Sequence, residues 1–206
     1  MMRRTILLMA TMALTLLVAS GVALAVTKIG TNGPDTLRGT NGDDNLLGKG
    51  GNDKLYALRG RDNLLGGPGK DVVIGGNLER SFKGDKTLVG GSGNDAVIGG
   101  LDSDTVVGNK GNDFLLDGDN GDVSLPQKDS LSGGGGNDVI SPINRPTDED
   151  IVVCGKGFDR VLVDRKDVVA PDCERVFVGL GSAEEWFNSI PQRFWEELPP
   201  PFNQIS

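Results

Sequence analysis

Aspartate recurs at intervals of nine residues through the middle of the chain, with a few longer gaps. The residues that we expect to bind a metal stand at this position, and they are Asp35, Asp44, Asp53, Asp62, Asp71, Asp95, Asp104, Asp113, Asp138 and Asp159. Carboxylates and turn carbonyls are the oxygen ligands that Ca²⁺ prefers, at about six to eight per ion. The chain contains no histidine, which excludes histidine-based acid–base catalysis and the usual zinc ligand sets. The spacing predicts binding of several calcium ions, and we do not expect an enzyme.

A short repeated unit must position each of these aspartates. Glycine precedes many of them by two residues, and Leu, Val or Ile often follows by two. The loop glycines on which we expect the turns to depend are Gly33, Gly51, Gly69, Gly93, Gly111 and Gly136. Because one apolar position recurs per unit, the pattern fits neither an amphipathic helix nor an alternating strand. It predicts stacked copies of a very short strand with one inward side chain, joined by glycine-rich turns.

Stacking has an electrostatic consequence for the aspartates. Equivalent residues in successive turns would lie about 4.8 Å apart. At this distance two like charges repel by roughly 3–4 kcal/mol when the effective dielectric constant is about 20. A hard divalent cation reverses the sign of this interaction, and Mg²⁺ demands a tighter octahedral geometry than such loops supply. The alternative is plain turn chemistry, because Gly, Asn and Asp all favour turns.

Three units, at 66–74, 90–98 and 133–141, carry the pattern Gly-Gly-x-Gly-x-Asp-x-apolar-x. They resemble the nonapeptide of RTX, or haemolysin-type, calcium-binding repeats, and the resemblance covers about residues 29–163. It implies an all-β fold, a right-handed parallel β-roll (β-solenoid) in which two nonapeptides make one turn. It also implies that Ca²⁺ is held between the loops of successive turns.

Alternate units would lie on two opposite edges of such a roll. The odd edge keeps aspartate in every unit, whereas Lys86 replaces it on the even edge, where all the spacing irregularities also fall. Lys86 either supplies a positive charge in place of a cation or reflects a drifted repeat. The calcium-binding pairs that we expect are Asp35/Asp53, Asp53/Asp71, Asp95/Asp113 and Asp44/Asp62.

Two insertions, at 75–83 and 117–128, interrupt the repeat. Loops on a rigid repeat scaffold often form binding surfaces, and neutral length variation on a tolerant edge is the alternative. Asp117, Asp119 and Asp122 in the second insertion offer a further set of calcium ligands, although their spacing matches no EF-hand loop.

The N-terminal residues 1–25 have the features of a signal peptide. Arg3 and Arg4 precede an apolar run at 6–18, and Ala23-Leu24-Ala25 offers a cleavage site. An uncleaved N-terminal anchor is the alternative. After cleavage the net charge is 19 − 29 = −10, so we do not expect nucleic acid as a partner. We expect a secreted or cell-envelope protein with no membrane span in the mature chain.

The C-terminal part is predicted to close the roll, which spans 26–163. Cys154 and Cys173 form an even pair, which in an exported protein favours one disulfide over two free thiols. Residues 164–181 are expected to form disulfide-linked capping strands. The segment 182–206 is expected to contain an amphipathic helix, over 182–198, followed by a proline-rich tail.

Two functions from different classes agree with these features. The first is an exported calcium-binding β-roll, with Ca²⁺ binding coupled to folding and a structural or cell-envelope role. The second is a calcium-dependent adhesion or interaction module, which would recognise an envelope or extracellular partner through the insertions or the C-terminal aromatic helix.

Overall fold

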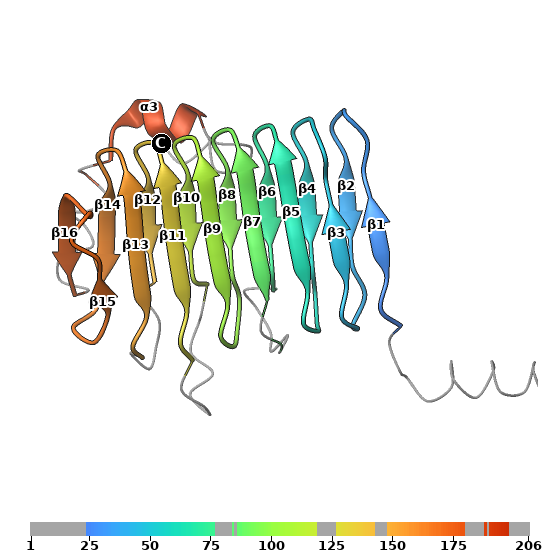
Figure 1. Cartoon of the computed structure of the whole chain (residues 1–206), viewed down its shortest axis with the longest axis horizontal. Helices are drawn as coiled ribbons and strands as arrows, with labels where there is room; N and C mark the ends of the chain where they lie inside the picture. Colours follow the sequence, from blue (N-terminus) through green and yellow to red (C-terminus); the bar gives the residue numbers. More distant parts are fainter. Residues whose placement is uncertain are drawn as a thin grey trace, which may run out of the picture.

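The chain folds into two parallel β-sheets of eight strands each, which face one another (Figure 1). The computed structural model describes residues 24–76, 84, 86–118, 127–142, 148–179, 188 and 190–197. The expected signal peptide and most of both insertions lie outside these residues. Among the described residues, no helix is both long and apolar enough to cross a membrane.

Consecutive strands alternate between the two sheets. The first sheet contains β1 (Thr27–Ile29), β3 (Asn45–Leu47), β5 (Asn63–Pro68), β7 (Thr87–Ser92), β9 (Thr105–Lys110), β11 (Ser130–Gly135), β13 (Ile151–Lys156) and β15 (Val168–Val169). The second sheet contains β2 (Thr36–Arg38), β4 (Lys54–Tyr56), β6 (Val72–Ile74), β8 (Ala96–Ile98), β10 (Phe114–Leu116), β12 (Val139–Ser141), β14 (Arg160–Val163) and β16 (Arg175–Val178).

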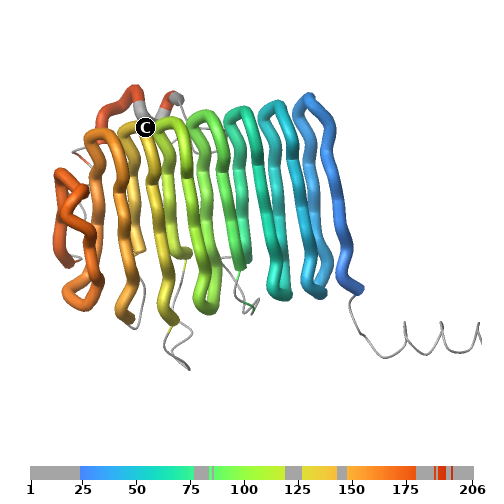
Figure 2. The backbone as a smooth tube through the Cα atoms, in the orientation of Figure 1, coloured from blue at the N-terminus to red at the C-terminus, as the bar shows by residue number. Residues whose placement is uncertain are grey.

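Each strand pairs in parallel with the strand two places later in the sequence, so two strands make one turn. Leu46 of β3 pairs with Leu64 of β5, and Leu55 of β4 pairs with Val73 of β6, each pair separated by eighteen residues. The tube drawing in Figure 2 follows these turns from one end of the molecule to the other. The expected parallel β-roll with two nonapeptides per turn is therefore confirmed.

The core consists mainly of one inward side chain from each of the strands β3 to β14. These side chains are almost fully buried, and they are Leu46, Leu55, Leu64, Val73, Leu88, Val97, Val106, Leu115, Leu131, Ile140, Val152 and Val161. They stand at the apolar position of the repeat, as the sequence predicts. The prediction of uniformly short strands was wrong for the first sheet, because from β5 to β13 its strands run for six residues. Parallel pairing continues there into the glycine-rich segment, as between Gly67 and Gly91.

The C-terminal strands add the last turn of the stack. β15 pairs with β13 and β16 pairs with β14, and a disulfide joins Cys154 to Cys173 with a Cα–Cα distance of 5.2 Å. The expected disulfide is present. A short helix, α3 (Gln192–Glu197), lies near this end of the roll (Figure 1). The rest of the helix expected over 182–198 falls mainly outside the described residues.

Candidate metal centre

The repeat aspartates lie on the two edges where the chain passes from one sheet to the other. The odd edge, uppermost in Figure 1, contains the loops that lead from the first sheet to the second. The even edge contains the loops that return to the first sheet. Each repeat aspartate immediately precedes a strand, for example Asp53 before β4 and Asp62 before β5.

On the odd edge the aspartates form a continuous hydrogen-bonded row. The backbone N–H of each one donates to Oδ1 of the aspartate one turn later, over distances of 2.7–2.9 Å. The row runs through Asp35, Asp53, Asp71, Asp95, Asp113, Asp138 and Asp159. These residues were predicted to lie in one row, and the structure brings them together.

The even edge has the same arrangement with one substitution. Asp44 donates to Asp62 at 2.8 Å, and Lys86 donates through its backbone to Asp104 at 2.8 Å. The row then continues from Asp104 through Asp129 and Asp150 to Asp167. Asp129 and Asp150 were not among the expected ligands, although both stand at the aspartate position of the repeat. In both units the glycine two residues before the aspartate is absent, because Gln127 and Asp148 stand there.

The second carboxylate oxygen is buried and lacks a hydrogen bond at most positions. This holds, within the described ranges, for Oδ2 of Asp53, Asp62, Asp71, Asp95, Asp113, Asp129, Asp138 and Asp159. All of these residues are almost fully buried. A buried carboxylate oxygen without a partner is costly, and an oxygen-seeking cation is the chemical group that would satisfy it. The donor set therefore fits calcium.

The first turn differs from the later ones. Thr31 donates through its backbone and its hydroxyl to Oδ2 of Asp35, and Thr40 does the same for Asp44. Oδ2 of both carboxylates thus has protein donors, and Oδ1 of Asp44 also accepts from the backbone N–H of Val26 at 2.7 Å. The structure supplies no such donor for Asp53 or Asp71, the later members of the expected pairs.

The first glycine of each unit leaves the space that the aspartate carboxylate of the same unit occupies. A Cβ at Gly90 would lie only 2.6 Å from Oδ2 of Asp95, and similar conflicts arise at Gly66 and Gly108. The sequence analysis concentrated on the glycine two residues before each aspartate. The Gly-Gly that opens units such as 66–74 and 90–98 already indicated that the first position must be glycine.

The glycines predicted to control the turns adopt a conformation that favours glycine. Gly51, Gly69, Gly93, Gly111 and Gly136 have φ between 111° and 152°. A Cβ at each of them would meet the backbone of the equivalent residue one turn earlier. Gly33, in the first turn, does not share the positive φ and has ample space around it. Asp102 replaces this glycine on the even edge and still keeps a φ of 77°, which aspartate tolerates better than most residues.

Burial strongly affects the protonation of the carboxylates. It raises the pKa of Asp71 to about 6, of Asp95 to about 8 and of Asp113 to about 9, and like charges in neighbouring turns add to the effect. The backbone hydrogen bonds to Oδ1 oppose the rise without cancelling it. The rows therefore favour a proton or a cation next to each carboxylate.

Lys86 is buried on the even edge, where the other units have aspartate. Only 3% of its surface is exposed, and its Nζ donates to the carbonyl oxygen of Gly84 at 2.6 Å. Burial raises the pKa of Asp62 to about 6, and the positive charge of Lys86 opposes that rise. This proximity favours the hypothesis that the lysine supplies the charge that a cation supplies elsewhere.

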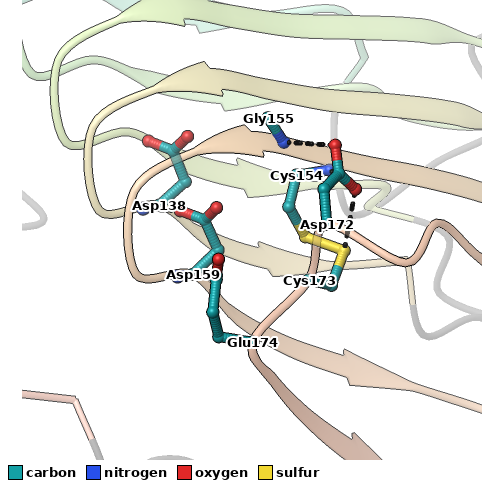
Figure 3. Close-up of a disulfide and its surroundings, with 7 residues drawn as sticks. All are labelled: Asp138, Cys154, Gly155, Asp159, Asp172, Cys173 and Glu174. Atoms are coloured by element: carbon teal, nitrogen blue, oxygen red, sulfur yellow. Dashed lines mark hydrogen bonds between the residues drawn. A yellow bond between two sulfur atoms is a disulfide. The ribbon is translucent and has the colours of Figure 1, made fainter.

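The odd row ends beside the disulfide (Figure 3). Asp159 donates through its backbone to Oε2 of Glu174 at 2.9 Å, so glutamate takes the place of aspartate in the final turn. Asp172, next to Cys173, accepts hydrogen bonds from the backbone N–H groups of Cys154 and Gly155. The sequence analysis missed Glu174 and Asp172 because the spacing between the last units is no longer nine.

Of the acidic residues in the second insertion, Asp117 is described, whereas Asp119 and Asp122 lie outside the described residues. The described residues flanking both insertions, such as Gly76 and Gly118, lie on the even edge.

Comparison with protein families gives one match. A family model described as RTX calcium-binding nonapeptide repeat matches four copies, at residues 29–64, 47–77, 84–115 and 127–141. A search of the curated proteins found no match. The matched segments contain the loops that carry the buried aspartate rows from Asp35 to Asp138.

Proposed function

Because residues 29–141 belong to the RTX calcium-binding nonapeptide repeat family, we propose that this chain is an exported protein whose folding is coupled to binding of several calcium ions. The observation that carries the proposal is the set of buried Oδ2 atoms without hydrogen-bond partners on both edges. Such atoms destabilise a metal-free roll at neutral pH, and a cation removes the penalty.

The proposed ligands are the ten aspartates at the repeat position. They are Asp35, Asp44, Asp53, Asp62, Asp71, Asp95, Asp104, Asp113, Asp138 and Asp159. Bound Ca²⁺ supplies positive charge and oxygen coordination in a setting where the carboxylates otherwise repel one another. In the turns after the first, the protein fixes Oδ1 by the hydrogen bond from the adjacent turn, and Oδ2 of residues such as Asp53 and Asp71 has no hydrogen-bond partner among the described residues.

We propose a structural or cell-envelope role rather than catalysis. The charged and apolar pattern of residues 1–25 supports export. An oxidising compartment agrees with the disulfide between Cys154 and Cys173. The residues gathered on the edges are mainly carboxylates and glycines, which suit a hard cation.

An interaction module is the second candidate function. It is favoured by the position of both insertions on the even edge, where they would project from a rigid scaffold. A pull-down from envelope extract, with and without 75–83 and 117–128, separates the two roles. A partner captured only by the intact chain and only with calcium supports the interaction module.

Asp71→Asn tests the calcium function, with Asp43→Asn as a matched control. Both changes remove one negative charge, but Asp71 is fully buried in the odd row, whereas Asp43 is exposed in an even-edge loop. In isothermal titration with Ca²⁺, we expect Asp71→Asn to weaken binding about tenfold or more and Asp43→Asn to leave it nearly unchanged. Equal weakening by both variants would contradict the assignment.

A further inference from the structure

Three carboxylates meet on the even edge, beside the second insertion. They belong to Asp117, Asp129 and Asp150, and one carboxylate oxygen of each lies within 4.8 Å of the others. Their exposed fractions are 0%, 1% and 0%. Each residue comes from a different turn or loop, so the fold rather than the local sequence brings them together.

Asp117 occupies a place that glycine holds in three other turns of the even edge, at Gly39, Gly75 and Gly99, and that Ala57 holds in a fourth. Its backbone N–H donates to the carbonyl oxygen of Ser141, as the N–H of Gly99 does to Leu116 one turn earlier. A Cβ at Gly99 would lie 2.8 Å from Oδ2 of Asp104. A side chain at the equivalent position 117 is consequently directed at the carboxylate of Asp129.

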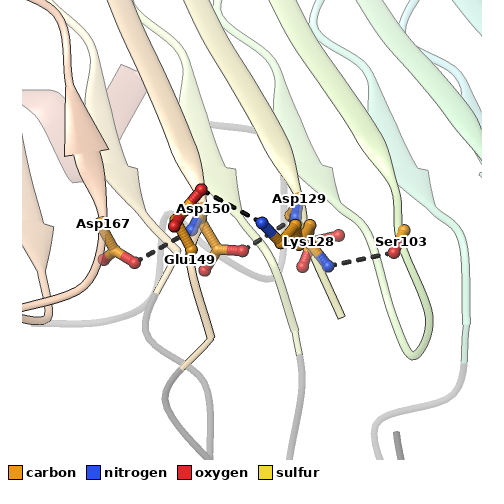
Figure 4. Close-up of polar contacts among 6 residues, drawn as sticks. All are labelled: Ser103, Lys128, Asp129, Glu149, Asp150 and Asp167. Carbon is orange, nitrogen blue, oxygen red and sulfur yellow. Dashed lines mark hydrogen bonds and ion pairs between the residues drawn. The ribbon is translucent and has the colours of Figure 1, made fainter. Parts of the chain in front are cut away.

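The carboxylates of Asp129 and Asp150 are held from the opposite side. Oδ1 of Asp129 accepts from the backbone of Asp104 at 2.6 Å. Oδ1 of Asp150 accepts from the backbone of Asp129 at 2.8 Å (Figure 4). Oδ2 of Asp129 is buried and lacks a hydrogen-bond partner among the described residues. It is thus an oxygen atom fixed next to two further carboxylates, one of which, that of Asp117, is close enough to share a proton with Asp129.

The basic residue next to Asp129 in the sequence, Lys128, is engaged elsewhere. Lys128 pairs with Glu149 at 3.1 Å on the surface, where their side chains are 63% and 54% exposed. Three buried carboxylates so close together repel strongly unless a proton is shared between them or a cation binds.

We propose that Asp117, Asp129 and Asp150 form a site for one hard divalent cation, of the Ca²⁺ class, that is additional to the ligand set proposed above. The nonapeptide pattern does not predict it, because Asp117 stands where the repeat has glycine. Three carboxylates give this site more negative charge than any two-aspartate pair of the roll, so it binds the tightest ion. The inference rests on the proposed function in one respect, since calcium at the repeats is what folds these turns.

Asp117→Gly is the decisive variant, because it restores the residue found at Gly39, Gly75 and Gly99. Glu149→Gln is its control, since it removes the same charge from an exposed position in the same turn. Both full-length variants are titrated with Ca²⁺ by calorimetry, and their β content at saturating Ca²⁺ is measured by circular dichroism. We expect Asp117→Gly to keep the β signal but to weaken the tightest binding step about tenfold or more, while Glu149→Gln matches the wild type.

An unchanged tightest step in Asp117→Gly would overturn the site, and so would equal weakening by Glu149→Gln. If Asp117→Gly loses its β signal, Asp117→Asn keeps the side-chain size and must show the same weakening. A wild-type chain that binds no Ca²⁺ would overturn both the site and the proposed function. A wild-type chain that binds normally, with Asp117→Gly indistinguishable from it, would overturn the site alone.

Discussion

Each repeat aspartate uses its two carboxylate oxygens differently. Oδ1 accepts a backbone hydrogen bond from the preceding turn, as Asp95 does from Asp71, and so helps to hold the stack together. Oδ2 faces the first glycine of its own unit and in most turns has no protein donor. Oδ1 therefore has a structural role, whereas Oδ2 is the oxygen that suits a cation.

Gly136→Ala tests the steric demand of the loops, with Gly135→Ala beside it as the control. Gly136 has a φ of 142°, and its Cβ would meet the carbonyl oxygen of Gly111, whereas a Cβ at Gly135 would have only one neighbour, 3.9 Å away. We expect Gly136→Ala to lower the free energy of unfolding by about 2–3 kcal/mol and Gly135→Ala by less than about 1 kcal/mol. Chemical denaturation in saturating Ca²⁺ measures both, and similar losses would contradict the packing described.

The raised pKa values predict how the metal-free chain responds to pH. Burial raises the pKa of Asp95 to about 8 and of Asp113 to about 9, whereas aspartate in an unfolded chain titrates near about 4. The folded, metal-free roll then binds more protons than the unfolded chain, so its stability is present below about pH 4 and is lost as the pH rises towards 9. In chelator, we expect more β signal at pH 5 than at pH 8, and stability that increases with pH would refute this expectation.

At the scale of the elements, one inward side chain per strand carries most of the packing. Leu64 and Leu65 are neighbours in β5, yet Leu64 is 2% exposed and Leu65 is 41% exposed. The alternation of faces along a strand explains the difference. The nine-residue pattern was sufficient to predict the inward residue, because a unit this small can bury its recurring apolar side chain only by stacking on its neighbours.

Leu64→Ala and Leu65→Ala make this difference measurable. Removing the Leu64 side chain leaves a cavity between the two sheets, and we expect a loss of about 2–5 kcal/mol in the free energy of unfolding. For Leu65→Ala we expect a loss below about 1 kcal/mol. If thermal or chemical denaturation in Ca²⁺ shows equal effects, the inward direction of Leu64 is wrong.

The final turns depend on the disulfide between Cys154 and Cys173, which are nineteen residues apart. Closing a loop of this length is worth about 3 kcal/mol in the unfolded-state entropy estimate. We expect Cys154→Ser/Cys173→Ser to lower stability by roughly this amount and to increase hydrogen exchange in β13–β16 more than in β2–β8. A uniform increase along the roll would show that the disulfide does not act locally.

Considered as a whole, the molecule is a stack whose regular parts were predictable and whose irregular parts were not. Period and composition sufficed for a stacked solenoid and its line of inward side chains. The resemblance to RTX repeats supplied the two units per turn that place Asp35 to Asp159 in one row. Glu174 at the end of that row could not be predicted, since glutamate replaces aspartate there and the spacing changes. Asp117 was a candidate ligand from the sequence, but its meeting with Asp129 and Asp150 could not be predicted, because an insertion separates residues that the fold brings together.

The whole chain offers the most direct test, through circular dichroism during a Ca²⁺ titration that starts from chelator at neutral pH. We expect a largely unfolded chain without metal, since no cation then neutralises the many buried carboxylates. We also expect a cooperative gain of β signal at roughly submillimolar to millimolar Ca²⁺. A chain that is equally folded in chelator and in Ca²⁺ would contradict the coupling of calcium binding to folding.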